Sequence, residues 1–199
     1  MNHGISILFR AIPVVMAFIC FCLGGFILMY GDDAAREVAG PVVFFLGSIC
    51  LALYATAATI IRQLIHKFHP TLKYIIPGFG YLVALITLIM GIWIFSTGGN
   101  SNFIVSGHVV SGIGLITACV ATAATSSTKF YLIPVNSGSA EQTINREGFS
   151  ALTEKVLIGL TILFSLVAWI WAIILLSRGE VGTYYFVAGS VMGGLACIC

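Results

Sequence analysis

Of the 199 residues in this chain, 59% are hydrophobic and only 8% are charged, and the formal net charge is +2. Soluble globular domains carry about 25% charged residues, so this composition excludes a domain that faces water on all sides. The few basic residues are dispersed along the sequence. Nucleic-acid binding needs them clustered on one face, so we expect no nucleic-acid partner.

Six apolar runs follow one another along the chain, separated by polar breaks. In a helix, roughly 20 apolar residues cross the hydrocarbon of a bilayer. Since backbone polar groups in lipid must be paired within their own segment, we expect each run to be a helix. The sequence therefore predicts an all-α, polytopic membrane helix bundle with six transmembrane helices in a single integral membrane domain. The expected spans are 8–30, 38–61, 74–96, 104–127, 155–177 and 183–199.

The first run also has the position of a signal peptide. It is longer than the apolar core of a typical signal peptide, and no small-x-small cleavage site precedes Asp32. We therefore expect a retained helix.

One short phrase occurs three times, each time as the chain begins an apolar run. It reads Val-Ala-Gly-Pro-Val at 38–42, Val-Ser-Gly-His-Val at 105–109 and Val-Ala-Gly-Ser-Val at 187–191. Internal repeats of this kind indicate an architecture built from copies of one unit. Because each unit holds two helices, successive units are parallel, unlike inverted transporter repeats. The predicted two-helix repeats cover about 8–64, 73–128 and 153–199, with a flexible cytoplasmic connector at about 129–152.

The basic residues predict the orientation of the bundle. With the N-terminus inside, only Arg36 and Arg178 of the nine Lys and Arg residues lie outside. This bias follows the positive-inside rule and favours a cytoplasmic N-terminus. The seven residues then inside are Arg10, Arg62, Lys67, Lys73, Lys129, Arg146 and Lys155.

Each copy of the phrase predicts the start of a helix, where glycine lets the backbone turn into the span and Pro41 suits the first helical position. Beyond the glycine, small residues recur at spacings of three and four, which puts them on one helix face. In lipid, such a stripe lets two backbones approach closely. We expect packing surfaces, with the lining of a substrate path as the alternative. The residues are Gly40, Gly47, Gly107, Ser111, Gly114, Ala118, Gly189 and Gly193.

Residues that could carry chemistry are few. No predicted span has a carboxylate, lysine or arginine in its middle, which argues against an ion-coupled pump. Asp32, Asp33 and Glu37 form a small acidic patch that we interpret as a solvated loop. No nucleophile–base pair and no paired carboxylates are recognisable, so we expect no enzymatic activity and no cofactor.

Threonines and cysteines lie within the predicted spans. The threonine hydroxyls could line a neutral path, but we expect them to bond back to carbonyls of the preceding turn. Cys20/Cys22 and Cys197/Cys199 resemble C-x-C pairs. Two positions along a helix point to opposite sides, so we expect no metal site. The threonines are Thr56, Thr59, Thr87, Thr117, Thr122 and Thr125.

His108 is the histidine that lies near a predicted span, in its first turn at the outer face. An imidazole with the ordinary pKa of about 6.5 gains charge as its surroundings acidify. A positive charge near a helix N-terminus is unfavourable, so protonation could loosen this helix end. His108 is therefore a candidate pH-sensing residue. The alternative is a neutral interfacial histidine bonded to a neighbouring loop.

The stretch 103–134, with its Val-Ser-Gly-His-Val start and Ala-Thr-Ala-Ala-Thr-Ser-Ser end, resembles the YhiM-like family of bacterial inner-membrane proteins. The stretch 38–64 resembles it too, through Ile-Cys-Leu-Ala-Leu at 49–53. The resemblance implies a polytopic inner-membrane protein associated with survival in acid, without established catalytic residues. Members usually carry His at the positions of Pro41 and Ser190, so a joint role of three histidines is weakened here. Members are also longer, which favours a truncated form or a fragment.

Together these features predict a non-enzymatic inner-membrane protein that supports acid-stress tolerance. A channel or facilitator for a small neutral solute or for protons is the alternative. The expected partner is the lipid bilayer, with a second copy of the chain or another membrane protein as further candidates. The small-residue stripes fit packing within one chain as well as packing between chains.

Overall fold

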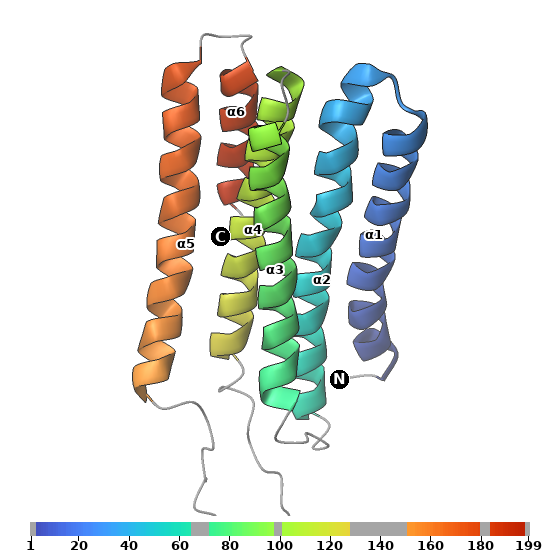
Figure 1. Ribbon diagram of the computed structural model, residues 1–199. Coiled ribbons are helices and arrows are strands. Elements are labelled where there is room, and N and C mark those ends of the chain that lie inside the picture. Colours follow the sequence, from blue (N-terminus) through green and yellow to red (C-terminus); the bar gives the residue numbers. More distant parts are fainter. Residues whose placement is uncertain (1–2, 65–71, 98–100, 128–150, 180–183, 198–199) are drawn as a thin grey trace, which may run out of the picture.

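The computed structural model describes residues 3–64, 72–97, 101–127, 151–179 and 184–197, and these form a bundle of helices without a strand (Figure 1). The all-α prediction is thereby confirmed, and five of the helices are long and apolar enough to cross a membrane. The sixth, α6, has 13 residues. The elements are α1 (His3–Tyr30), the π-helix η1 (Ala35–Ala39), α2 (Gly40–Leu64), α3 (Leu72–Thr97), α4 (Ser101–Ser127), α5 (Ala151–Arg178) and α6 (Tyr184–Ala196).

Successive helices are antiparallel, so α1, α3 and α5 run one way and α2, α4 and α6 the other (Figure 1). Helix α4 is central and packs against α2, α3, α5 and α6. Helix α1 lies at one edge and packs against α2 and η1. The bundle is therefore organised around α4.

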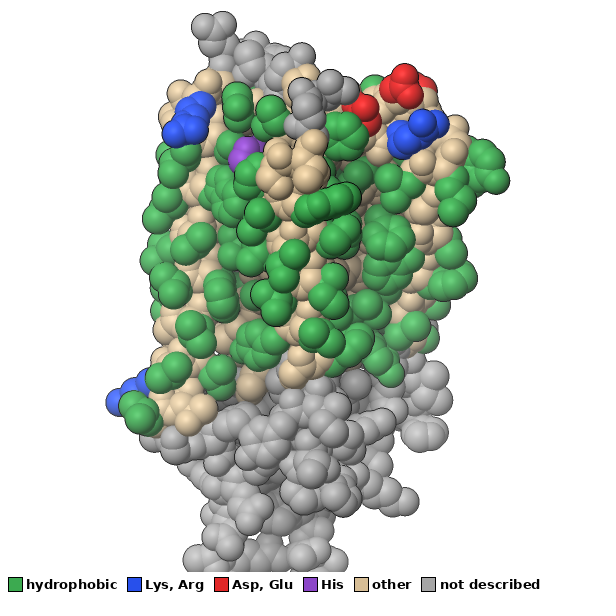
Figure 2. Space-filling view, viewed as in Figure 1, with side chains coloured by type: hydrophobic (Ala, Val, Ile, Leu, Met, Phe, Trp, Pro, Cys, Tyr) green, Lys and Arg blue, Asp and Glu red, His purple; other side chains and the backbone are tan. Residues whose placement is uncertain are grey.

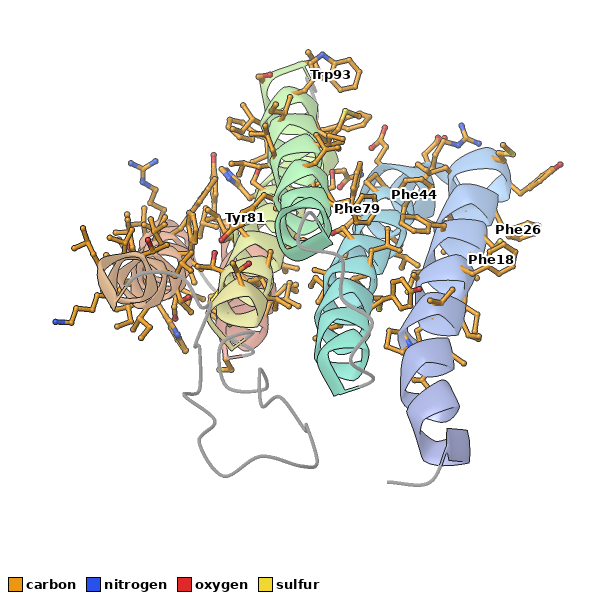
Figure 3. All side chains as sticks on the ribbon, turned by 90° about the horizontal axis from the view of Figure 1, so that it is seen from below. Phe18, Phe26, Phe44, Phe79, Tyr81 and Trp93 are labelled. Carbon is orange, nitrogen blue, oxygen red and sulfur yellow. The ribbon has the colours of Figure 1, made fainter. Side chains whose placement is uncertain are left out.

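The face of the bundle shown in Figure 2 has a hydrophobic middle, and the charged side chains of its described residues lie at the two ends. Large apolar side chains such as Phe18, Leu166 and Ile170 are more than half exposed, as lipid contact allows. In Figure 3, Phe18 and Phe26 point away from the bundle. This distribution is that of a multi-pass membrane protein.

Helix α2 begins at Gly40, within the first repeated phrase, but the backbone does not turn sharply there as predicted, because η1 leads directly into α2. Gly40 has helical dihedral angles, φ −56° and ψ −59°, and its N–H donates to the carbonyl of Ala35 in a π-turn. Pro41 lacks an N–H, so the carbonyl of Glu37 has no donor at the usual helical spacing. The helix widens into a π-turn just before the proline, a known way of absorbing such an interruption. Gly107 likewise lies seven residues into α4 rather than at its start.

The buried threonines do bond to their own helices, as predicted. Thr87 donates to Val83 O at 2.8 Å and Thr117 to Ile113 O at 2.7 Å. Thr122 and Thr125 donate to carbonyls of α4, each at 2.7 Å. These hydroxyls therefore occupy packed positions. The side chains of Thr56 and Thr59 lie outside the described residues.

Candidate functional site

The predicted small residues of α4 lie where α3 and α4 approach most closely. A Cβ built on Gly107 would come within 2.5 Å of the Phe95 backbone N, and one on Gly114 within 2.7 Å of the Leu88 N. From the other side, a Cβ on Gly91 would overlap the backbone of Ser111. Only glycine allows two backbones to come this close. Ala118 is half-buried farther along the helix.

The other two hairpins repeat this contact. A Cβ on Gly40 would lie 2.9 Å from the Leu28 side chain of α1, and one on Gly189 would lie 2.9 Å from the Leu176 N of α5. Gly47 faces the Phe21 ring, and Gly193 is in ordinary contact with Ala172. In all three hairpins the glycine of the phrase thus lies against the preceding helix.

Two glycines that we did not single out from the sequence complete the pattern. Gly24 and Gly91 each lie sixteen residues before the glycine of the phrase. A Cβ on Gly24 would overlap the backbone of Phe44, as one on Gly91 overlaps Ser111. The spacing between these glycines is a sequence signal that could have identified them.

His108 lies among aromatic rings from three helices. Its ring stacks on Phe95 of α3, with centroids 4.9 Å apart and planes 20° from parallel. Trp171 of α5 meets it edge-on at 5.7 Å, and Tyr185 of α6 lies 6.3 Å away. We call Phe95, Trp171 and Tyr185 the aromatic cage. Helix α4 therefore carries an imidazole at the point where α3, α5 and α6 converge.

The polar surroundings of His108 are sparse. Its Nδ1 is buried without a hydrogen-bond partner among the described residues. The neighbouring loops at 98–100 and 180–183, to which the alternative refers, lie outside the described residues. Arg178, at the end of α5, is close enough to act electrostatically on the ring. On the face shown in Figure 2, the Lys, Arg, Asp and Glu side chains of the described residues lie at the ends of the bundle. The imidazole is thus surrounded by aromatic rings, and Arg178 is the charged group that acts on it.

The acidic patch is only partly the solvated loop that we predicted. Asp32 caps the following turn by accepting from Ala35 N, and Asp33 is 94% exposed beside Arg36. Glu37 instead accepts a hydrogen bond from Asn102 Nδ2 of α4 at 3.0 Å. This carboxylate ties η1 to the start of the central helix, a contact that the local sequence does not reveal.

A second polar contact between helices lies deeper in the bundle. Ser48 Oγ of α2 and Thr117 Oγ1 of α4 are 3.1 Å apart and both buried. Within the second hairpin, Tyr81 donates to Thr122 Oγ1 at 2.9 Å, and Figure 3 shows its side chain on the α4 side of α3. Polar contacts therefore link α4 to both α2 and α3.

Among the described His, Cys, Asp and Glu side chains, no three lie together as metal ligands would. Cys20 is half-buried while Cys22 is exposed, so this C-x-C pair faces two directions. Cys119 is buried in α4, and its Sγ lies 3.7 Å from Thr161 O of α5. Cys199 lies outside the described residues.

Comparison with known proteins identifies relatives of the whole chain. The family described as "Protein of unknown function (DUF2776)" matches residues 1–199. "Inner membrane protein YhiM" of Escherichia coli (strain K12) is 40% identical over 202 aligned residues, covering 100% of this chain and 57% of YhiM. The chain thus spans little more than half the length of this relative. The match confirms the resemblance carried by the two motif stretches. No solved structure matches the chain.

Proposed function

Because the chain belongs to the DUF2776 family and its relative YhiM is an inner membrane protein, we propose that it is a non-enzymatic inner-membrane protein supporting tolerance of acid. His108 is the residue that responds to acid in this proposal. The observation that carries it is the aromatic cage, which holds a titratable ring where four helices meet.

A neutral imidazole suits the cage, since stacked and edge-on rings attract one another. Protonation changes this balance, because an imidazolium carries a proton on both ring nitrogens. Nδ1 then becomes a donor without an acceptor among the described residues. The ring faces of the cage can compensate part of the new charge through cation–π attraction.

The charges around His108 give the response a direction. Arg178 of α5 repels an imidazolium, and the sequence of α3 has no charged residue between Tyr74 and Thr97. On the side of α6, the ring that faces His108 is that of Tyr185. Glu37 of η1 is bonded to Asn102, six residues before His108 along α4. Protonation would therefore push α5 away from α4 and loosen this end of the bundle.

The end of the bundle that contains His108 must face the acid. The positive-inside bias of the sequence supports a cytoplasmic N-terminus, which puts this end outside. Of the described basic side chains, Arg36 and Arg178 lie at this end and Lys155 at the other. We therefore assign the turn between α1 and α2 to the outside.

Survival of bacteria that produce the protein tests this function. His108→Asn removes the titrating group while keeping a planar polar side chain. We expect it to lower survival after exposure to pH 4.5 to the level of cells without the protein, with no effect at pH 7. Ser177→Asn is the matched control, because Ser177 is exposed near the same end of the bundle and lies outside the aromatic cage. Equal survival of the His108→Asn variant and the wild type, at equal membrane levels, would overturn the proposal.

A channel or facilitator remains the alternative function, with the threonines as its lining. The described threonines count against it, since their hydroxyls are committed to their own helices and Thr117 and Thr122 are fully buried. Flux of protons and small neutral solutes into proteoliposomes, at outside pH 7 and 4.5, separates the two functions. Flux that increases in acid would favour the channel. The absence of flux at both pH values, from protein shown to be folded, would favour the non-conducting role.

A further inference from the structure

Helices α1 and α2 approach each other closely along their shared interface. A Cβ on Gly24 of α1 would overlap the backbone of Phe44 in α2, and one on Gly47 of α2 would lie 2.8 Å from the Phe21 ring of α1. The Phe21 and Phe44 rings meet edge to face, with centroids 5.0 Å apart. The two backbones are therefore near each other, as a covalent bridge between helices requires.

A cysteine from each helix lies one turn beyond these contacts. Cys20 lies four residues before Gly24 in α1, and Cys50 lies three residues after Gly47 in α2. Residues three and four apart share one face of a helix, so both cysteines belong to the faces that α1 and α2 turn toward each other. In the structure the two thiols are in hydrogen-bonding contact, and both residues are half-buried.

The other described cysteines have different surroundings. Cys22 is exposed, two residues along α1 from Cys20. Cys119 and Cys197 direct their sulfur atoms at backbone carbonyls, those of Thr161 and Gly193. Cys20 and Cys50 instead meet each other across a helix interface.

The pair lies deep in the hairpin. Cys20 comes ten residues before Tyr30, where α1 ends, and Cys50 comes ten residues after Gly40, where α2 begins. At the helical rise, ten residues cover about 15 Å, which is half of a hydrocarbon layer roughly 30 Å thick. The stretches 11–31 and 38–61 contain no charged residue. Chemistry at this depth is therefore favoured when it creates no charge.

Two thiols in contact can bind a soft metal ion or form a disulfide. Metal binding requires deprotonated thiols, and the charge it leaves is costly in an apolar interior. A disulfide is as uncharged as the two thiols that it replaces. The position of Cys20 and Cys50 therefore favours the disulfide.

We propose that Cys20 and Cys50 form a redox-active pair, which a quinone dissolved in the bilayer oxidises to a disulfide between α1 and α2. The oxidant must reach the middle of the hydrocarbon, and a quinone does so because it is uncharged and apolar. Two S–H bonds break and one S–S bond forms. The two electrons and two protons pass to the quinone, which becomes a quinol, so no charged product remains in the membrane.

The disulfide would fasten the helix at the edge of the bundle. Among the described elements, α1 packs on α2 and η1 alone. Only 11% of the residues in its hydrophobic window are buried. A bridge across the α1–α2 interface should therefore hold α1 more firmly in the oxidised protein than in the reduced one.

The test uses a variant that retains Cys20 and Cys50, with the other four of the six cysteines replaced by Ser. In nanodiscs, addition of a short-chain ubiquinone should consume both thiols and produce one quinol per chain. Maleimide labelling after denaturation counts the free thiols, and a non-reducing gel should show monomers. The matched control retains Cys22 and Cys50 in the same two helices, and it should lose less than about a tenth as many thiols.

A second measurement tests the link between the helices. In mixed micelles, oxidation of the Cys20/Cys50 variant should move its unfolding transition to a higher fraction of denaturing detergent, and reduction should reverse the shift. The reduced variant should unfold as the wild type does, which controls for a packing defect.

Four results would overturn the proposal. Both thiols could stay free in the folded variant after addition of the quinone, or the Cys22/Cys50 control could lose its thiols equally well. Disulfide-linked dimers would show a contact between chains in place of one between α1 and α2. An unfolding transition that oxidation leaves unchanged would show that α1 is not fastened.

Discussion

Helices α4 and α1 are similar in length and both apolar, yet they occupy opposite environments. Within their hydrophobic windows, 72% of the α4 residues are buried and only 11% of the α1 residues. Helix α4 is rich in Gly, Ser, Ala and Thr, whereas α1 carries large Phe, Leu, Ile and Met side chains. In lipid, hydrophobicity alone does not decide whether a helix lies in the interior of the bundle or at its lipid-facing surface. Side-chain size does, because small residues let helices pack closely.

The largest contrast between these helices should come from truncating isoleucines. Ile113 of α4 is 0% exposed, and Ile19 of α1 is 47% exposed. Ile113→Ala leaves a cavity and should lower the free energy of unfolding by about 2–5 kcal/mol. Ile19→Ala faces lipid, which fills the space, so we expect little change. Unfolding titrations in mixed detergent micelles measure both, and equal losses would contradict the central position of α4.

Adding a single carbon to a glycine should have the next largest effect. Gly91→Ala places a methyl group against the backbone of Ser111, whereas Gly25→Ala in α1 meets nothing within 4 Å. Overpacking of this kind costs about 1–3 kcal/mol. Alanine at the open site should instead stabilise the helix by up to about 1 kcal/mol. In thermal melts, we expect Gly91→Ala to lower the melting temperature and Gly25→Ala to raise it. An unchanged melting temperature in Gly91→Ala would mean that α3 and α4 can move apart without cost.

The smallest effect should come from the polar contact between α2 and α4. Ser48 Oγ lies 2.6 Å from Phe45 O, and Thr117 donates to Ile113 O, so the single protons of the two hydroxyls are in competition. The bond between the helices is therefore made only part of the time. A double-mutant cycle with Ser48→Ala and Thr117→Val should give a coupling of about 0.6 kcal/mol, typical of such bonds in membranes. A coupling near zero would show that the hydroxyls serve only their own helices.

The sequence was sufficient to locate the helices. Each long charge-free run forms a helix in the structure. For example, the expected span 155–177 lies inside the observed helix Ala151–Arg178. Gly107, Ser111 and Gly114 share one helix face because of their spacing, and in the structure they lie against α3. The sequence could not show that Gly40 continues a helix, since the π-turn depends on how Pro41 is accommodated.

The surroundings of His108 could not be predicted in the same way. The histidine itself stands out in an apolar run, but Phe95, Trp171 and Tyr185 belong to three different helices. Their meeting depends on the rotation and depth of each helix, which periodicity in one segment does not set. From the sequence, tryptophans and tyrosines near a membrane boundary indicate an aromatic belt at least as readily as a cage.

The most direct test of the account is the fluorescence of Trp171 as a function of pH. Trp93→Phe and Trp169→Phe change two exposed positions and leave Trp171 as the sole tryptophan. A protonated imidazole in contact with an indole quenches its emission. In nanodiscs, the emission should fall between pH 7 and 4.5, and His108→Asn should abolish the titration. Emission that does not change with pH, or that titrates equally in the His108→Asn variant, would contradict the role of His108.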